Sequence, residues 1–168
     1  SGGINWEFVN PDTADIYEYK DIFFINSNTG YFGAINLTNN YAYVFKTTNS
    51  GLSWKWYNTG VDALEMTNMY FINDNGWCAG DRFGKLYTMK TTNGGLDWKE
   101  QISLPPDEFN SLYFFNSNTG FISASSSFRK TTNGGMNWIQ ITNVGGYDLT
   151  FLDTITGYAC GIAGRIRK

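Results

Sequence analysis

Carboxylates are the side chains of this sequence best suited to catalysis, because two facing Asp or Glu residues can hydrolyse a glycosidic bond. Asp62 and Asp107 lie in connecting segments that could meet on one side of the fold. No motif around either residue selects it for that role. We therefore predict no catalytic residue, and the sequence indicates no metal ligand and no cofactor.

Other reactive residue types are absent or unpaired. The chain has no His, which excludes a Ser-His-Asp triad, a His metal site and a His pH switch. Its two cysteines, Cys78 and Cys160, follow the turn glycines of related segments by two and three residues. Strand side chains alternate between faces, so these thiols should point opposite ways in different repeats. We expect two unpaired thiols that act as small core residues.

Composition and charge restrict the class of protein. Net charge is −3 with a pI near 4.8, and a nucleic-acid partner is not expected because binding phosphates needs a basic surface. Aromatic residues make up 18% of the chain, which is too apolar for disorder. No apolar run reaches the roughly 18 residues of a membrane span. No signal peptide is visible and the sequence starts within a motif, which indicates a mature piece or a fragment.

An octapeptide recurs along the chain and must be positioned by the same local structure each time. Its tryptophans recur every 40 to 48 residues, a spacing typical of repeat architectures. We call this octapeptide the box, and predict that it is a structural turn between two strands. Its repeated positions are Thr47, Asn49, Gly51 and Trp54; Thr91, Asn93, Gly95 and Trp98; Thr131, Asn133, Gly135 and Trp138; and, in a copy cut by the N-terminus, Trp6.

A second motif recurs in phase with the box. It consists of an apolar run, a polar turn that ends in Gly, and an aromatic residue that opens the next run. The four copies begin at Phe24, Phe71, Phe114 and Phe151. This order is typical of two strands joined by a tight turn.

The two motifs together resemble the Asp-box, or bacterial-neuraminidase repeat, and look most like the branch that contains the photosystem II assembly factors and related uncharacterised bacterial proteins. The resemblance covers the whole chain. It departs from the family where Asn49, Asn93 and Asn133 replace the usual Asp, although Asn can still accept a backbone hydrogen bond across a turn. The resemblance implies a β-propeller.

The repeats predict one all-β domain over residues 1–168, with four four-stranded blades. We expect blade 1 at about 20–58, blade 2 at about 66–102, blade 3 at about 110–142, and blade 4 at about 147–168 plus 1–10. In the fourth blade, residues 165–168 end the chain where a box should follow, and residues 6–10 read as the missing last strand. We expect those two segments to pair, because an uncovered strand edge promotes aggregation.

Three modes of closure remain open at this stage. The N-terminal strand can complete the last blade of its own chain in a four-bladed ring, or of a second copy in an eight-bladed two-chain ring, or of successive copies in an open polymer. The resemblance implies larger rings, whereas pairing within one chain gains from a high effective concentration. Part of a larger propeller is the remaining alternative.

The resemblance also divides the connections between two faces of the propeller. The boxes and the polar turns should share one face, and the remaining connections should form a loop face that is rich in acidic and aromatic residues. We take the following residues as candidates for binding on the loop face: Tyr17, Asp62, Glu65, Asp81, Arg82, Phe83, Asp107, Phe109 and Tyr147.

The favoured function is a non-catalytic, extracytoplasmic propeller, secreted, periplasmic or on the cell surface, that recognises a protein or glycan through the loop face. A sialidase needs three converging arginines, and Arg82, Arg129, Arg165 and Arg167 cannot converge from their repeat positions. A fragment of a secreted glycoside hydrolase, sialidase-like or xyloglucanase-like, is the second hypothesis. The third is a structural unit that self-associates by exchange of terminal strands.

Overall fold

The computed structural model of the chain describes residues 6, 11, 15, 17–161 and 165–168. Every regular element within them is a β-strand, so the expected all-β class is confirmed. The strands form three four-stranded antiparallel sheets and one three-stranded sheet, each built from strands consecutive in the chain. We call these sheets blades 1 to 4. None of the described residues forms a helix that could cross a membrane.

The strands of the four blades follow one another without interruption. Blade 1 contains β1 (Tyr17–Phe24), β2 (Gly30–Asn36), β3 (Tyr41–Thr47) and β4 (Lys55–Asp62). Blade 2 contains β5 (Glu65–Ile72), β6 (Asn75–Arg82), β7 (Lys85–Thr91) and β8 (Lys99–Ser103). Blade 3 contains β9 (Phe109–Phe114), β10 (Gly120–Ala124), β11 (Phe128–Thr131) and β12 (Ile139–Thr142). Blade 4 contains β13 (Asp148–Phe151), β14 (Gly157–Gly161) and β15 (Arg165–Arg167).

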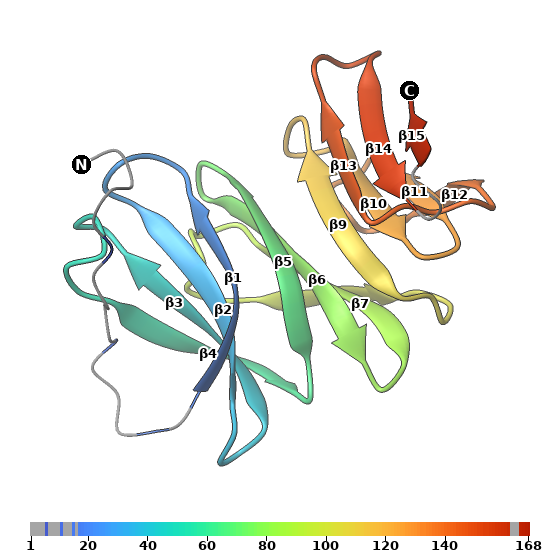
Figure 1. The fold of residues 1–168 in the computed structure, drawn as a ribbon. Coiled ribbons are helices and arrows are strands. Elements are labelled where there is room, and N and C mark those ends of the chain that lie inside the picture. The colour runs from blue at the N-terminus through green and yellow to red at the C-terminus, as the bar shows by residue number, and fades with distance from the viewer. Residues whose placement is uncertain (1–5, 7–10, 12–14, 16, 162–164) are drawn as a thin grey trace.

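The blades are arranged as an open arc (Figure 1), with the blue sheet of blade 1 and the red sheet of blade 4 at opposite ends. The first strand of each blade lies innermost, so that β1, β5, β9 and β13 contact one another in sequence. The described strands of blades 1 and 4 share no hydrogen-bonded sheet. The propeller fold is therefore present without a closed ring among these residues.

Equivalent polar side chains join each inner strand to the next one. They occupy the position just before the apolar run of the second motif, where the sequence places Asp21, Asn68, Ser111 and Asp148. The contacts are Met69 N to Asp21 Oδ2 at 2.6 Å, Leu112 N to Asn68 Oδ1 at 3.0 Å, and Ser111 Oγ to Asp148 Oδ1 at 2.7 Å. Each contact pairs a backbone or side-chain group that would otherwise be unpaired between two sheets.

Aromatic stacking fills the space between neighbouring blades. The ring that follows each turn glycine stacks on the phenylalanine that opens the second motif of the next blade. The ring centroids are 3.8 Å apart for Tyr31 and Phe71, 3.8 Å for Trp77 and Phe114, and 4.5 Å for Phe121 and Phe151. The third pair is tilted by 36°, where the first two are nearly parallel at 7° and 12°. Blades 3 and 4 accordingly leave an apolar cleft of about 400 Å³ between them.

The box is a side-chain-capped turn. In blade 2, Thr91 Oγ1 accepts a hydrogen bond from Gly95 N at 3.0 Å and donates to Asn93 Oδ1 at 2.9 Å. Asn93 Oδ1 also accepts from Asp97 N at 3.1 Å. Blades 1 and 3 repeat these three bonds with Thr47, Asn49 and Gly51 and with Thr131, Asn133 and Gly135. An Asn therefore makes the turn at the position where the Asp-box repeats that the sequence resembles have Asp.

Each box is tied to the polar turn of its own blade, so the two motifs share one face. Ser50 N donates to Asn28 O, Gly94 N to Asp74 O, and Gly134 N to Asn118 O, at 2.8 to 2.9 Å. The box of blade 2 is also bonded to blade 1, since Lys46 Nζ donates to Gly94 O at 2.8 Å. The box tryptophans differ in burial: Trp98 and Trp138 are 9% and 8% exposed, Trp54 is half-buried, and Trp6 is 88% exposed.

Two expectations about the last blade have different outcomes. The sequence predicts that residues 6–10 pair with residues 165–168. Of the first segment the structure describes only Trp6, so this pairing lies outside the described residues, and β15 pairs with β14. The prediction that Cys160 is a core residue is wrong. Cys78 is free and fully buried, whereas Cys160 is free and exposed, because it lies on a side of blade 4 that no described blade covers.

Candidate binding face

The loop face is the side of the arc opposite the boxes. It is formed by the connections β2–β3, β4–β5, β6–β7, β8–β9, β10–β11 and β12–β13. The β2–β3, β4–β5, β6–β7 and β8–β9 connections are shorter than the sequence indicated, since the flanking strands extend into them. Tyr17, Glu65, Asp81, Arg82 and Phe109 thus belong to strands rather than to loops.

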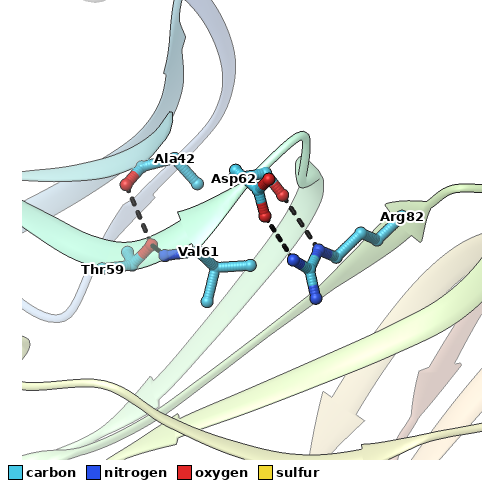
Figure 2. Close-up of polar contacts among 5 residues, drawn as sticks. All are labelled: Ala42, Thr59, Val61, Asp62 and Arg82. Atoms are coloured by element: carbon cyan, nitrogen blue, oxygen red, sulfur yellow. Dashed lines mark hydrogen bonds and ion pairs between the residues drawn. The ribbon is translucent and has the colours of Figure 1, made fainter. Parts of the chain in front are cut away.

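Blades 1 and 2 are joined on this face by an ion pair between Asp62, the last residue of β4, and Arg82, the last residue of β6. Arg82 Nη2 bonds Asp62 Oδ1, and Arg82 Nε donates to the Asp62 carbonyl at 2.9 Å (Figure 2). The hydrogen bond from Arg82 lowers the pKa of the Asp62 carboxyl and raises that of the guanidinium. The carboxylate and the carbonyl of Asp62 together hold the Arg82 guanidinium in one orientation.

The backbone that carries Asp62 is itself fixed. Thr59 Oγ1 donates to Ala42 O at 2.9 Å and accepts from Val61 N at 3.3 Å (Figure 2). Ala63 follows with a φ of 50°, a left-handed conformation that turns the chain into blade 2. The backbone of residues 59–63 is therefore constrained, and it fixes the position of Asp62 in the ion pair.

An exposed aromatic ring lies beside this ion pair. Phe83 is 73% exposed and has a φ of 54° in the tight β6–β7 connection. The guanidinium of Arg82 lies 5.4 Å from the Phe83 ring and 5.2 Å from the buried Tyr87 ring, both within cation–π range. Asp81 Oδ1 accepts from Gly84 N at 3.0 Å and shapes the turn. This geometry presents Phe83 outward next to a paired charge.

The carboxylates of the β8–β9 connection are occupied in shaping the face. Asp107 accepts from Ser126 N at 3.0 Å and from Ser127 Oγ at 2.6 Å, and Glu108 accepts from Ser125 Oγ at 3.0 Å. The β8–β9 and β10–β11 connections are thereby joined. Asp62 and Asp107 thus have different hydrogen-bond partners, Arg82 for Asp62 and the β10–β11 turn for Asp107.

The remaining candidates have varied surroundings. Phe109 is only 7% exposed and packs in the core between blades 2 and 3, so its prediction as a loop-face binding residue is wrong. Tyr17 is half-buried against Tyr43 and Phe45. Glu65 lies 4.0 Å from the Lys20 ammonium, and Tyr147 is 55% exposed. Among the described residues, no three His, Cys, Asp or Glu side chains gather as a metal site.

Sequence reasoning missed the exposed apolar residues Leu37 and Val144, which lie in the β2–β3 and β12–β13 connections of the loop face. They are 57% and 48% exposed. Each is an apolar residue in a connection made mostly of polar residues and Gly. An apolar residue in such a segment predicts an exposed apolar side chain, and this pattern could have identified both from the sequence.

The sheets and their order define a β-propeller, and comparison with solved structures agrees. YCF48 from Cyanidioschyzon merolae matches with a TM-score of 0.64 and 16% identity, over 98% of this chain and 60% of that one. YCF48 bound to D1 peptide matches at 0.53 and 16%, over 98% and 67%. An ancestral GH74 enzyme matches at 0.62 and 17%, over 92% of this chain and 23% of that one.

At these identities the likeness shows the fold alone, and it confirms the resemblance to these propellers that the motifs indicated. The chain spans about 60% of the length of the Cyanidioschyzon protein. No family model matches the sequence. No curated protein matches it either.

Proposed function

We propose that the chain is a non-catalytic propeller that binds a protein segment through the loop face around Phe83. The observation that carries this proposal is the exposed Phe83 ring held beside the Asp62–Arg82 ion pair. Aromatic residues and Arg are enriched at protein interfaces, where a rigid ring loses little conformational entropy on binding. The fold match to YCF48 bound to D1 peptide supports a peptide rather than a glycan as the partner.

The chemistry of the face indicates what such a segment would contain. Leu37, Phe83, Val144 and Tyr147 offer apolar surface, while Glu65 and Asp148 are exposed carboxylates on strands that border it. A segment with an apolar anchor and a nearby Lys or Arg would complement both features. An acidic segment would be repelled.

Catalysis by a carboxylate pair is disfavoured by the same geometry. A general acid needs a raised pKa, whereas the hydrogen bond from Arg82 lowers the pKa of Asp62. Asp107 already accepts two hydrogen bonds from the β10–β11 turn. We also propose that the chain acts outside the cytoplasm, which its resemblance to assembly-factor propellers supports and which cell fractionation tests.

The binding proposal is tested by selecting a display library of random peptides on the purified chain, with a glycan array probed in parallel. We expect selected peptides to carry an apolar residue near Lys or Arg, and to lose at least tenfold in affinity for Phe83→Ala. Leu52→Ala is the matched control, since Leu52 is 86% exposed in the box of blade 1. Peptides that bind Phe83→Ala normally, or binding to glycans alone, would overturn the proposal.

A further inference from the structure

The interfaces between blades are built from equivalent positions in successive repeats. We call the side of a blade that packs on the preceding blade its N-side face, and the other its C-side face. The N-side face of blade 2 contains Met66, Met69 and Phe71, which are 1%, 1% and 4% exposed. In blade 3 the same positions are Phe109, Leu112 and Phe114, at 7%, 4% and 1%.

The N-side face of blade 1 has the same apolar character without a covering blade. Tyr19, Ile22 and Phe24 occupy these three positions and are 47%, 61% and 43% exposed. Tyr19 and Ile22 border a hollow of about 290 Å³ that is also lined by Pro11, Phe32 and Trp54. Three large apolar residues along one inner strand are unusual on a solvated surface.

The C-side face of blade 4 is the matching uncovered half. In blade 1, the C-side residues Ile25, Tyr31 and Val44 pack into the core shared with blade 2. Their equivalents in blade 4 are Leu152, Tyr158 and Ile166, which are 73%, 36% and 78% exposed. Each end of the arc thus presents one half of an interface that occurs complete inside it.

We propose that the C-side face of blade 4 packs on the N-side face of blade 1 of a second copy of this chain, head to tail. Blade 4 of the second copy packs in the same way on blade 1 of the first copy. The two identical interfaces close a two-chain ring. A second copy is the occupant because the two faces complement each other residue by residue, and because the chain's own N-side face lies at the opposite end of the arc (Figure 1). This proposal is independent of binding at Phe83.

The internal interfaces specify the contacts at this junction. Tyr158 of one copy stacks on Phe24 of the other, as Tyr31 stacks on Phe71 at 3.8 Å within the chain. Lys168 lies at the position of Lys46, whose Nζ donates to the carbonyl of Gly94 in the next box. The equivalent acceptor in the second copy is the Ser50 carbonyl.

The exposed thiol of Cys160 provides a direct test of this geometry. Cys160 occupies the position of Gly33, where a built Cβ would lie 3.2 Å from Met66 Cβ in the next blade. Tyr19 occupies the position of Met66 on the uncovered N-side face. A cysteine at residue 19 would therefore lie close to Cys160 of the second copy, near the Cβ–Cβ separation of about 3.5–4.5 Å that a disulfide needs.

The experiment oxidises purified Tyr19→Cys and separates the products by non-reducing gel electrophoresis. We expect a product of twice the 19.0 kDa chain that reductant reverses and that Cys160→Ser removes. Leu52→Cys, a cysteine equally free to react in the box of blade 1, should form no disulfide-linked dimer and should run at the mass of one chain on the gel. Cys78 is fully buried and should not react.

Three results would overturn the proposal. An internally cross-linked monomer would show that the ring closes within one chain, and a ladder of larger products would show an open polymer instead of a two-chain ring. The third is a folded variant that does not cross-link. Light scattering gives a second test. The natural chain and Leu52→Asp should each have the mass of two chains in solution, whereas Ile166→Asp should have the mass of one chain.

Discussion

Trp98 of the second box meets Phe71 of its own blade edge-on, with ring centroids 5.9 Å apart and planes at 88°. Phe71 is at the same time stacked face to face on Tyr31 of blade 1. The box of blade 2 is thereby part of the core between blades 1 and 2. Aromatic pairs in these two geometries stabilise a core beyond the area that they bury.

Trp98→Ala should destabilise the fold by about 3–5 kcal/mol, as expected when a buried aromatic side chain is deleted and leaves a cavity. Chemical denaturation monitored by circular dichroism measures the change. Trp56→Ala is the matched control, since Trp56 is 52% exposed on β4. It should cost under about 1 kcal/mol. Equal midpoints for the two variants would contradict a structural role for the box.

Asp107→Ala should destabilise the fold, although Asp107 lies in a connection between strands on the loop face. Asp107 accepts two hydrogen bonds that join neighbouring connections, and its removal would leave Ser126 N and Ser127 Oγ without that acceptor. We expect a cost of about 1–3 kcal/mol, measured by the same denaturation. A cost near zero would mean that water replaces the carboxylate fully.

Gly95→Ala should be more destabilising than Gly84→Ala, although both glycines have left-handed backbones with φ of +85° and +73°. A Cβ at residue 95 would lie 3.2 Å from Cε1 of Tyr31, whereas a Cβ at residue 84 would meet nothing within 4 Å. The backbone strain, about 1 kcal/mol, is common to both. Their difference in thermal midpoint therefore measures packing against Tyr31. Equal shifts would contradict that contact.

Asp21→Asn should stabilise the chain at neutral pH, since burial raises the pKa of Asp21 above its ordinary 3.8. With a raised folded pKa, the folded state binds more protons, and the free energy of unfolding falls as pH rises through that pKa. An amide still accepts from Met69 N, as Asn68 accepts from Leu112 N in the next blade.

Thermal unfolding between pH 3 and 7 tests this prediction. The advantage of Asp21→Asn should be largest at pH 7 and vanish below the ordinary pKa of 3.8. Asp153→Asn is the control of opposite sign, because hydrogen bonds from Ile155 N and Thr156 N lower the pKa of Asp153. That variant should lose stability relative to the natural chain as pH rises. An Asp21→Asn variant that is weaker at pH 7 would refute the argument.

Asn93→Asp, which introduces the residue usual in the Asp-box repeats that the sequence resembles, should destabilise blade 2 by about 1 kcal/mol. Asn93 Nδ2 donates to the Asp97 carboxylate at 2.9 Å, and a second carboxylate there would repel it. Asn133→Asp is the matched change in blade 3, where Asn137 replaces Asp97 and can donate to the new carboxylate. It should be close to neutral. Denaturation midpoints in the reverse order would exclude this electrostatic reason for Asn.

The repeats determined much of the fold by local rules alone. Thr, Asn and Gly at fixed spacing build each box from hydrogen bonds within about five residues, so Thr91, Asn93 and Gly95 specify their turn whatever surrounds it. Alternating apolar strands around such turns predict antiparallel sheets, and four repeats predict four blades. These inferences need no knowledge of contacts between distant residues.

Only the tertiary structure decided which side of each blade is covered. Phe109 and Tyr147 look alike as aromatic residues next to polar connections, yet one is buried between blades 2 and 3 and the other is exposed. Cys78 and Cys160 follow similar turns, and they differ because strand alternation sends one to a packed face and the other to a bare one. Burial depends on the neighbouring blade, which is set by the packing of residues distant in sequence, and that information is absent from a local pattern.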